Sequence, residues 1–163
     1  MIDYNNFDFD SEKLSIEKLK ELPNNALLYS IKYDNNIISF PINNVKTPFG
    51  LEKYYNDYII KIQLSEHKLK KFIYNLEDYI SNINKNNFKS QIKKNSNFDD
   101  LLTIKISNNK NDISIKSSNS SLITIFDIKK KSSLNCIIFM DLIWTNSNNV
   151  VAKFKTNNIT LIE

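Results

Sequence analysis

The stretch "YNDYIIKIQLSEHKLKKFIYNLEDYI", Tyr55 to Ile80, changes its hydrophobic period near its middle. Apolar and polar side chains first alternate, which predicts a strand with one buried face formed by Tyr58, Ile60, Ile62 and Leu64. From Ser65, a candidate N-cap, apolar residues recur at three- and four-residue spacing, which predicts an amphipathic helix that ends at Ile83. The apolar side of this helix consists of Leu69, Phe72, Ile73, Leu76, Ile80 and Ile83.

The only glycine among the 163 residues, Gly50, stands just before this strand in the sequence "TPFG". Proline presets φ at the second position of a type I β-turn, and glycine is favoured at the fourth position. We therefore expect a turn at 47–50 that leads the chain into the strand.

Short strands are predicted on both sides of this strand–helix unit. Before it, Leu27–Tyr33 and "IISF" form a hairpin through "DNN", because Asn tolerates the positive φ that such a turn needs. Still earlier, Ser15–Leu22 is predicted as a short helix that ends before Pro23. After the helix, a polar mobile loop is expected at 84–98, followed by the strands "LLTIKI", "DISIK", "LITIFDI", "NCIIFMDLIW", "VVAKFK" and "ITLI".

One helix among many strands is typical of the mainly β or α+β class. The length of 163 residues favours a single domain, 1–163, that begins with an acidic segment at 1–22. A content of 41% hydrophobic and 25% charged residues indicates a soluble globular protein. No apolar run approaches the roughly 20 residues of a membrane span, and the acidic N-terminal segment is unlike a secretory signal.

The single cysteine, Cys136, cannot form an internal disulfide, which favours a reducing intracellular compartment. Its alternating neighbours indicate a small buried side chain rather than a reactive thiol. Every cationic side chain apart from the sole histidine is lysine, and the net charge of +4 only mildly favours a polyanionic partner.

The residue types of most catalytic and metal sites are sparse. His67 and Cys136 are each the only residue of their kind, so a zinc site lacks ligands. A single glycine excludes phosphate-binding loops, which need several glycines. The acidic pairs Glu77–Asp78 and Asp99–Asp100 are expected to be caps or surface charges. We therefore expect a protein that is not an enzyme and that has no metal and no cofactor.

Aromatic and lysine side chains share the predicted strands, and this combination offers nucleic-acid bases a stacking surface and phosphates a counter-charge. Core packing is the competing interpretation for each aromatic residue. The predicted nucleic-acid-binding residues are Lys53, Tyr55, Lys61, Lys105, Lys116, Phe139, Trp144, Lys153 and Lys155.

The stretch "SSLNCIIFMDLIWTNSNNVVAKFKTNNITLIE", Ser132 to Glu163, resembles the last strands of phage-type single-stranded DNA-binding proteins, whose relatives occur in large nucleocytoplasmic DNA viruses. The strand–helix unit at Tyr55–Ile80 fits the same family. The resemblance implies a five-stranded oligonucleotide/oligosaccharide-binding (OB) barrel, with the helix across it and an N-terminal hairpin added. Trp144 matches the family's tryptophan, and whether it stacks on bases or packs in the core is open. The long acidic tail that many relatives carry has no counterpart in the residues up to Glu163.

This resemblance also implies a function: coating single-stranded DNA without sequence preference during viral DNA replication, recombination or repair. The site of action would be the cytoplasmic viral factory or the nucleus of an infected cell, with replication proteins as further partners and no membrane. Homo-oligomerisation is left open. A virion or assembly β-domain is an alternative, and so is an RNA-binding factor, which would need the 2′-OH. The acidic "IDYNNFDFD" either imitates nucleic acid or fixes an edge strand through Phe7 and Phe9.

Overall fold

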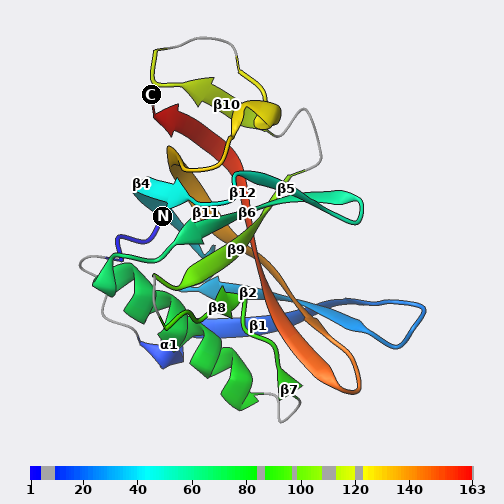
Figure 1. Cartoon of the computed structure of the whole chain (residues 1–163). Helices are drawn as coiled ribbons and strands as arrows, with labels where there is room; N and C mark the ends of the chain where they lie inside the picture. Colours follow the sequence, from blue (N-terminus) through cyan, green and yellow to red (C-terminus); the bar gives the residue numbers. More distant parts are fainter. Residues whose placement is uncertain (5–9, 84–86, 97–98, 108–112, 120–122, 163) are drawn as a thin grey trace.

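The long strand β11 (Ser132–Thr145) lies at the centre of the sheet in the computed structural model, which describes residues 1–4, 10–83, 87–96, 99–107, 113–119 and 123–162 (Figure 1). On one side it pairs antiparallel with β12 (Asn149–Ile162). On the other side it pairs with β4 (Ser39–Thr47) and, near its end, with β2 (Leu27–Tyr33). Its alternate side chains Leu134, Cys136, Ile138 and Met140 are buried, as the period of a strand with one core face requires.

The other strands extend the sheet from β12 and β2. Strand β12 pairs in parallel with β7 (Asn87–Phe88), β9 (Leu101–Ile106) and β10 (Ser114–Ser117). From β9 the sheet continues antiparallel through β6 (Asp57–Gln63) to β5 (Leu51–Tyr54). The remaining strands are β1 (Leu14–Glu21) and β3 (Asn36–Ile37), which both pair with β2, and β8 (Ile92–Lys93), which pairs with β9.

Within the described residues, the sheet has twelve strands and is open, with β1 and β5 at the two ends of its main path. A mainly β fold with one helix is therefore confirmed, but the five-stranded barrel is wrong. The physical reason lies in β11 and β12, which are 14 residues long and therefore pair with several shorter strands in succession. The predicted strands "VVAKFK" and "ITLI" are one strand, β12, which keeps its pairing with β11 past two irregularities in register.

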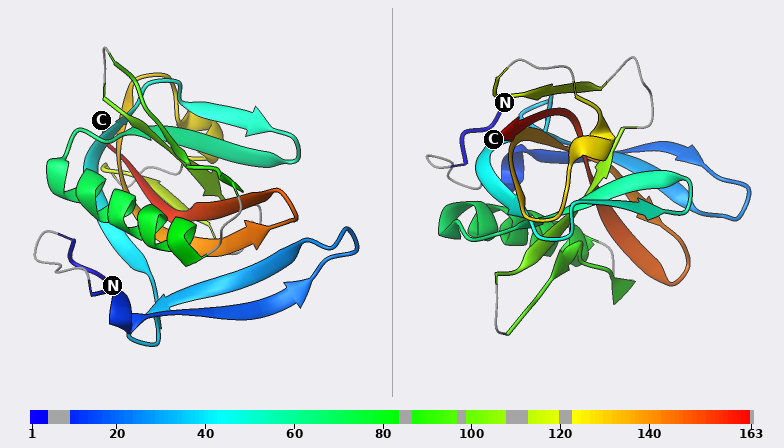
Figure 2. Two further views of the ribbon diagram at one scale, coloured as in Figure 1. Left: turned by 90° about the horizontal axis from the view of Figure 1, so that it is seen from below. Right: turned by 45° about the horizontal axis from the view of Figure 1, so that its top comes forward.

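The helix α1 (His67–Ile83) begins two residues after Ser65 and lies along one side of the sheet (Figures 1 and 2). Its predicted apolar side is confirmed except at Ile83, whose side chain lies outside the described residues. Phe72 contacts Phe40 of β4 edge-on, with ring centroids 5.1 Å apart. The buried residues that join the helix to the sheet are Leu69, Phe72, Ile73, Leu76 and Ile80.

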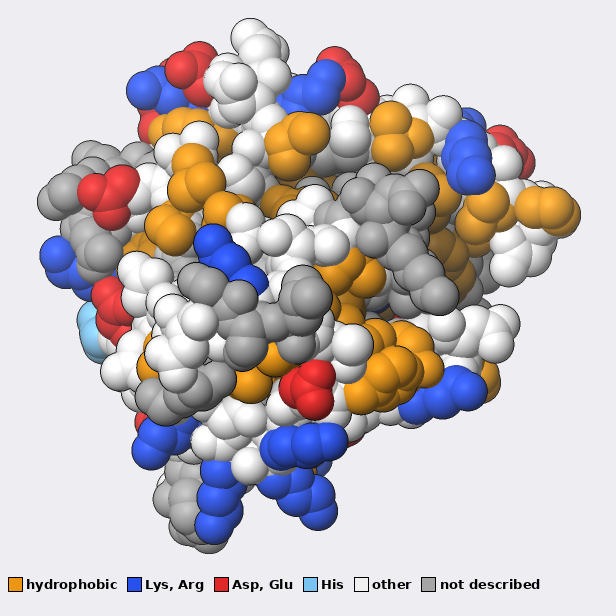
Figure 3. All heavy atoms as spheres, turned by 90° about the horizontal axis from the view of Figure 1, so that it is seen from above, with side chains coloured by type: hydrophobic (Ala, Val, Ile, Leu, Met, Phe, Trp, Pro, Cys, Tyr) orange, Lys and Arg blue, Asp and Glu red, His pale blue; other side chains and the backbone are white. Residues whose placement is uncertain are grey.

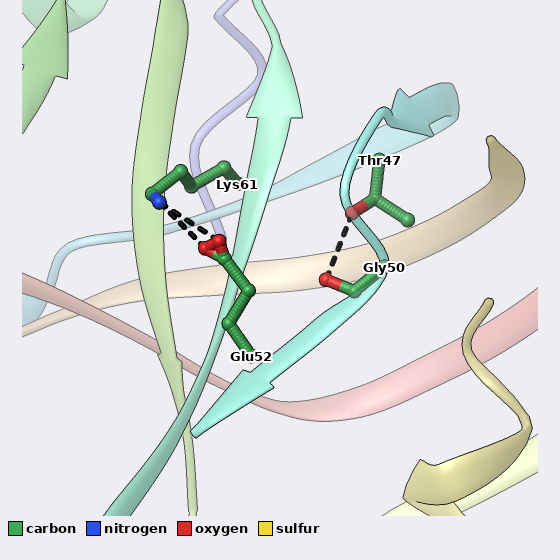
Figure 4. A network of polar contacts seen from close by, with 4 residues as sticks. All are labelled: Thr47, Gly50, Glu52 and Lys61. Carbon is green, nitrogen blue, oxygen red and sulfur yellow. Dashed lines mark hydrogen bonds and ion pairs between the residues drawn. The ribbon is translucent and has the colours of Figure 1, made fainter. Parts of the chain in front are cut away.

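The predicted turn at Gly50 is confirmed. Its N–H donates to the carbonyl oxygen of Thr47 at 3.3 Å, and the hydroxyl of Thr47 donates to the carbonyl oxygen of Gly50 at 3.3 Å (Figure 4). The hairpin at "DNN" is confirmed as well, because Asp34 and Asn35 have φ of 50° and 61° between the paired strands β2 and β3.

Two predicted elements are wrong because tertiary pairing and local capping outweigh a short pattern. Ser15–Leu22 is not a helix: strand β1 covers most of it and pairs with β2. The described part of "LITIFDI", 123–128, is not a strand, because Ile125–Asp127 forms a 3₁₀ turn in which the carboxylate of Asp127 accepts the N–H of Thr124 at 2.7 Å. The described part of the predicted mobile loop, 87–96, contains β7 and β8.

The chain start is joined to the rest of the fold through Ile2 and Tyr4. The N–H of Ile2 donates to the carbonyl oxygen of Ser39, and the hydroxyl of Tyr4 donates to Glu66 at 2.9 Å. Tyr4 is only 7% exposed, and burial together with Glu66 raises the pKa of its phenol. A structural role therefore holds for Tyr4, whereas Phe7 and Phe9 lie outside the described residues.

Candidate functional site

An open groove with a volume of about 940 Å³ lies between the β5–β6 hairpin and the sheet formed by β9, β12 and β11. Three hairpins, β1–β2, β5–β6 and β11–β12, project toward the same side of the molecule, to the right in Figure 1 and in the left view of Figure 2. The β5–β6 and β11–β12 hairpins contribute residues to the groove. It is lined by Tyr54, Tyr55, Asp57, Ile59, Lys61, Gln91, Thr103, Lys105, Trp144, Val151, Lys153 and Phe154.

Strand alternation forms the floor of the groove. Ile60, Ile104 and Ala152 point into the core and are fully buried. Their neighbours along β6, β9 and β12 therefore point to the other face of the sheet. Since the three strands are paired side by side, this alternation aligns a set of lysines and β-branched side chains across them, namely Ile59, Lys61, Thr103, Lys105, Val151 and Lys153.

Aromatic side chains form two walls of the groove. Trp144 is half-buried near the end of β11, so it belongs neither to the buried core nor to the fully exposed surface. Opposite it, Tyr54 and Tyr55 occupy the tip of the β5–β6 hairpin, with their rings edge-on and their centroids 4.7 Å apart. Tyr55 is 82% exposed and has a φ of 53°, an uncommon conformation for a bulky residue. Backbone strain of this kind is often found at binding sites.

Three lysines on this face form ion pairs with acidic residues. Lys61 binds Glu52 at 2.5 Å (Figure 4), Lys105 binds Asp57 at 2.8 Å, and Lys155 lies 3.8 Å from Asp141. Partly exposed pairs of this kind contribute about 0–1 kcal/mol each to stability. Lys153 is exposed and has no recorded ion pair within the described residues.

The structure brings five of the nine predicted nucleic-acid-binding residues together in the groove: Tyr55, Lys61, Lys105, Trp144 and Lys153. Lys155 and Phe139 lie beside it, with the ammonium group of Lys155 5.8 Å from the centre of the Phe139 ring. Lys53 and Lys116 are exposed on β5 and β10 and do not line the groove.

Sequence reasoning missed the acidic partners Glu52, Asp57 and Asp141. All three ion pairs are diagonal pairs between neighbouring strands. Lys61 lies two residues from Ile59, which pairs with Glu52. Similarly, Asp57 lies two residues from the partner of Lys105, and Asp141 two residues from the partner of Lys155. Such diagonal neighbours lie within reach of long side chains. Only the strand register reveals them, so the sequence alone carried no signal for these pairs.

The prediction that the acidic pairs are surface charges is wrong for one member of each. Glu77 is 4% exposed and accepts hydrogen bonds from the hydroxyl of Ser90 at 2.5 Å and the N–H of Gln91 at 2.9 Å. Burial raises the pKa of Glu77 despite these bonds. Asp100 is 7% exposed and is held by residues of α1 and by the chain before it. Both carboxylates therefore fix the segments around β8 to the helix.

Other candidate chemistry is not gathered in one place. Cys136 is buried, as predicted, and burial raises the pKa of its thiol to about 12. His67 is exposed at the start of α1. In the part of the chain that the structure describes, no cluster of histidine, cysteine or acidic side chains is placed to hold a metal ion.

The chain matches no protein-family model and no curated protein. None of the described helices is long and apolar enough to cross a membrane. Seen from above, hydrophobic side chains form separate patches, and lysine and acidic side chains lie between them (Figure 3). The lysines do not form one continuous positive surface on this face.

Proposed function

We propose that this groove binds single-stranded nucleic acid, with single-stranded DNA as the favoured ligand, and that the protein has a binding role without catalysis. The observation that carries the proposal is the groove itself, where Trp144 and Tyr55 stand on opposite sides of a floor that presents Lys61, Lys105 and Lys153. Aromatic rings stack on bases of any sequence, while lysines contact the phosphates between them.

The resemblance of Ser132–Glu163 to phage-type single-stranded DNA-binding proteins supports the same function, in viral DNA replication, recombination or repair within an infected cell. The barrel that this family implies is not the fold of this chain, so the proposal depends on the groove more than on the resemblance. The aromatic residues that line the groove also favour a single strand with accessible bases, because bases inside a duplex are stacked on one another.

Fluorescence titration with labelled poly-dT at low salt, beside duplex DNA and poly-U, tests the proposal. We expect poly-dT to bind more tightly than duplex. Preference for poly-U by tenfold or more would replace DNA with RNA as the ligand. Absence of binding to all three oligonucleotides would contradict the proposal and favour protein contacts, as in a virion or assembly domain.

Replacing Trp144 with Ala should weaken poly-dT binding by roughly 1–3 kcal/mol, the contribution of stacking on one base. Because Trp144 is half-buried, its loss should cost less stability than the roughly 3–5 kcal/mol typical of a core aromatic. The matched control is Phe126→Ala, which removes an exposed aromatic ring outside the groove and should leave the affinity unchanged. Equal affinities of wild type and Trp144→Ala, measured per folded molecule, would remove Trp144 from the site.

A further inference from the structure

The three ion pairs of the groove face share one geometry. Each joins a lysine to a carboxylate on a neighbouring strand, diagonally across the sheet, and each leaves both side chains between 25% and 35% exposed. The pairs are therefore open to solvent and to a ligand. They differ from the pair between Lys70 and Asp100, in which the carboxylate is nearly buried.

The pairs change the charge that a strand of nucleic acid would meet. The groove lysines are Lys61, Lys105 and Lys153, with Lys155 beside them. Of the carboxylates that pair with these lysines, Asp57 lines the groove, whereas Glu52 and Asp141 lie next to it, paired with Lys61 and Lys155. Four positive and three negative charges leave a formal net charge of +1 on this face. A phosphate that reaches a paired lysine must share it with a carboxylate or displace that carboxylate.

We propose that Glu52, Asp57 and Asp141 are resident counter-ions, which the phosphates of a bound strand displace from Lys61, Lys105 and Lys155. This inference rests on the proposed binding of single-stranded nucleic acid. Lys153 is the first contact, since no ion pair is recorded for it among the described residues. A strand is then retained mainly by its bases on Trp144 and Tyr55, while charge contributes little.

Weak salt dependence follows from this arrangement. For single strands, the slope of log K against log salt is about −0.7 per phosphate charge that the protein neutralises. A net charge of +1 predicts a slope of about −0.7 for the wild type, while four unpaired lysines predict about −2.8. The displaced carboxylates recover cations from solution, and this uptake offsets part of the release from the nucleic acid.

The test compares wild type with Glu52→Gln, Asp57→Asn, Asp141→Asn and the triple variant, each titrated with labelled poly-dT at several salt concentrations. We expect each single variant to bind several-fold more tightly at low salt, and the triple variant to have a slope steeper by about 2. The matched control is Glu17→Gln. It removes the same charge from an ion pair with Lys32, 2.8 Å long, on the β1–β2 hairpin outside the groove, and should change affinity less than twofold.

A second measurement does not depend on the fold of the triple variant. Lys105→Gln should weaken binding more in the Asp57→Asn background than in the wild type, because Lys105 is then no longer shared. If wild type binds poly-dT while the carboxylate variants keep its affinity and slope, the counter-ion inference is wrong and the proposed function stands. If neither wild type nor the variants bind any oligonucleotide, the proposed function itself is wrong.

Discussion

Replacing Gly50 with Ala should lower the free energy of unfolding by about 2–4 kcal/mol, as the sum of two independent costs. The first is conformational. Gly50 has a φ of +70°, and an L-residue in this left-handed region costs roughly 1–2 kcal/mol. Urea denaturation followed by circular dichroism at pH 7 measures the change.

The second cost is steric. A Cβ on Gly50 would lie 2.6 Å from the backbone carbonyl carbon of Lys129 and 2.9 Å from the carbonyl oxygen of Ile128. These atoms belong to backbone that is fixed by pairing, since the N–H of Leu51 donates to the same Ile128 oxygen at 3.0 Å. Backbone cannot move aside as a flexible side chain does, so the variant must shift the turn at 129–131 or the start of β5.

Asn35→Ala is the matched control. Asn35 also has a positive φ, 61°, but it is exposed at the tip of the β2–β3 hairpin. Because Asn35 already carries a Cβ in the left-handed region, Asn35→Ala adds no atom and removes only the tolerance of Asn for this conformation, so it should be less destabilising than Gly50→Ala. If the two variants were equally destabilised, the close approach of 128–130 to Gly50 would contribute nothing and only the turn conformation would matter.

Gly50 illustrates which features can be predicted from the sequence and which cannot. Its place after Pro48 identified the turn, because turn chemistry is local and belongs to four consecutive residues. The backbone at 128–130, which lies close to Gly50, is far away in the sequence, and no local pattern predicts this contact. The same division holds for the helix, whose apolar side was predicted correctly from its period over many residues.

Short or isolated patterns were less reliable. Ser15–Leu22 has too few apolar residues to separate helix from strand, and its pairing with β2 decided the outcome. The barrel was inferred from the order of the elements, whereas strand partners depend on register and length. The predicted lysines lie on strands, but the ion pairs that moderate the charge of Lys61, Lys105 and Lys155 are created by the register of β5 with β6, β6 with β9 and β11 with β12.

Asp100→Ala is expected to lower the free energy of unfolding by about 2–4 kcal/mol, because its nearly buried carboxylate accepts several hydrogen bonds and each such bond to a charged group contributes about 1.5–3 kcal/mol. The carboxylate of Asp100 accepts hydrogen bonds from the ammonium of Lys70 at 2.7 Å, the hydroxyl of Tyr74 at 3.0 Å and the N–H of Asn95 at 3.1 Å. Removing it leaves these donors without their acceptor and releases α1 from the chain at 95–100. The neighbouring Asp99 is exposed, so Asp99→Ala should stay within about 0.5 kcal/mol of wild type.

The charge of Asp100 also predicts how this loss depends on pH. The hydrogen bond with Lys70 is the main cause that holds the pKa of Asp100 below its ordinary value. A carboxylate with a lowered pKa in the folded state stabilises the protein above the unfolded pKa, about 4, and loses that contribution as the pH falls through the folded pKa.

The difference in unfolding free energy between wild type and Asp100→Ala should therefore be full at pH 7 and become smaller below about pH 4. The raised pKa of Glu77 acts in the opposite direction, but it is common to both proteins and cancels in the comparison. Urea titrations of the two proteins from pH 7 to pH 3 measure this difference. If it stayed constant over that range, Asp100 would act through packing and neutral hydrogen bonds, and its charge would not hold the helix to the sheet.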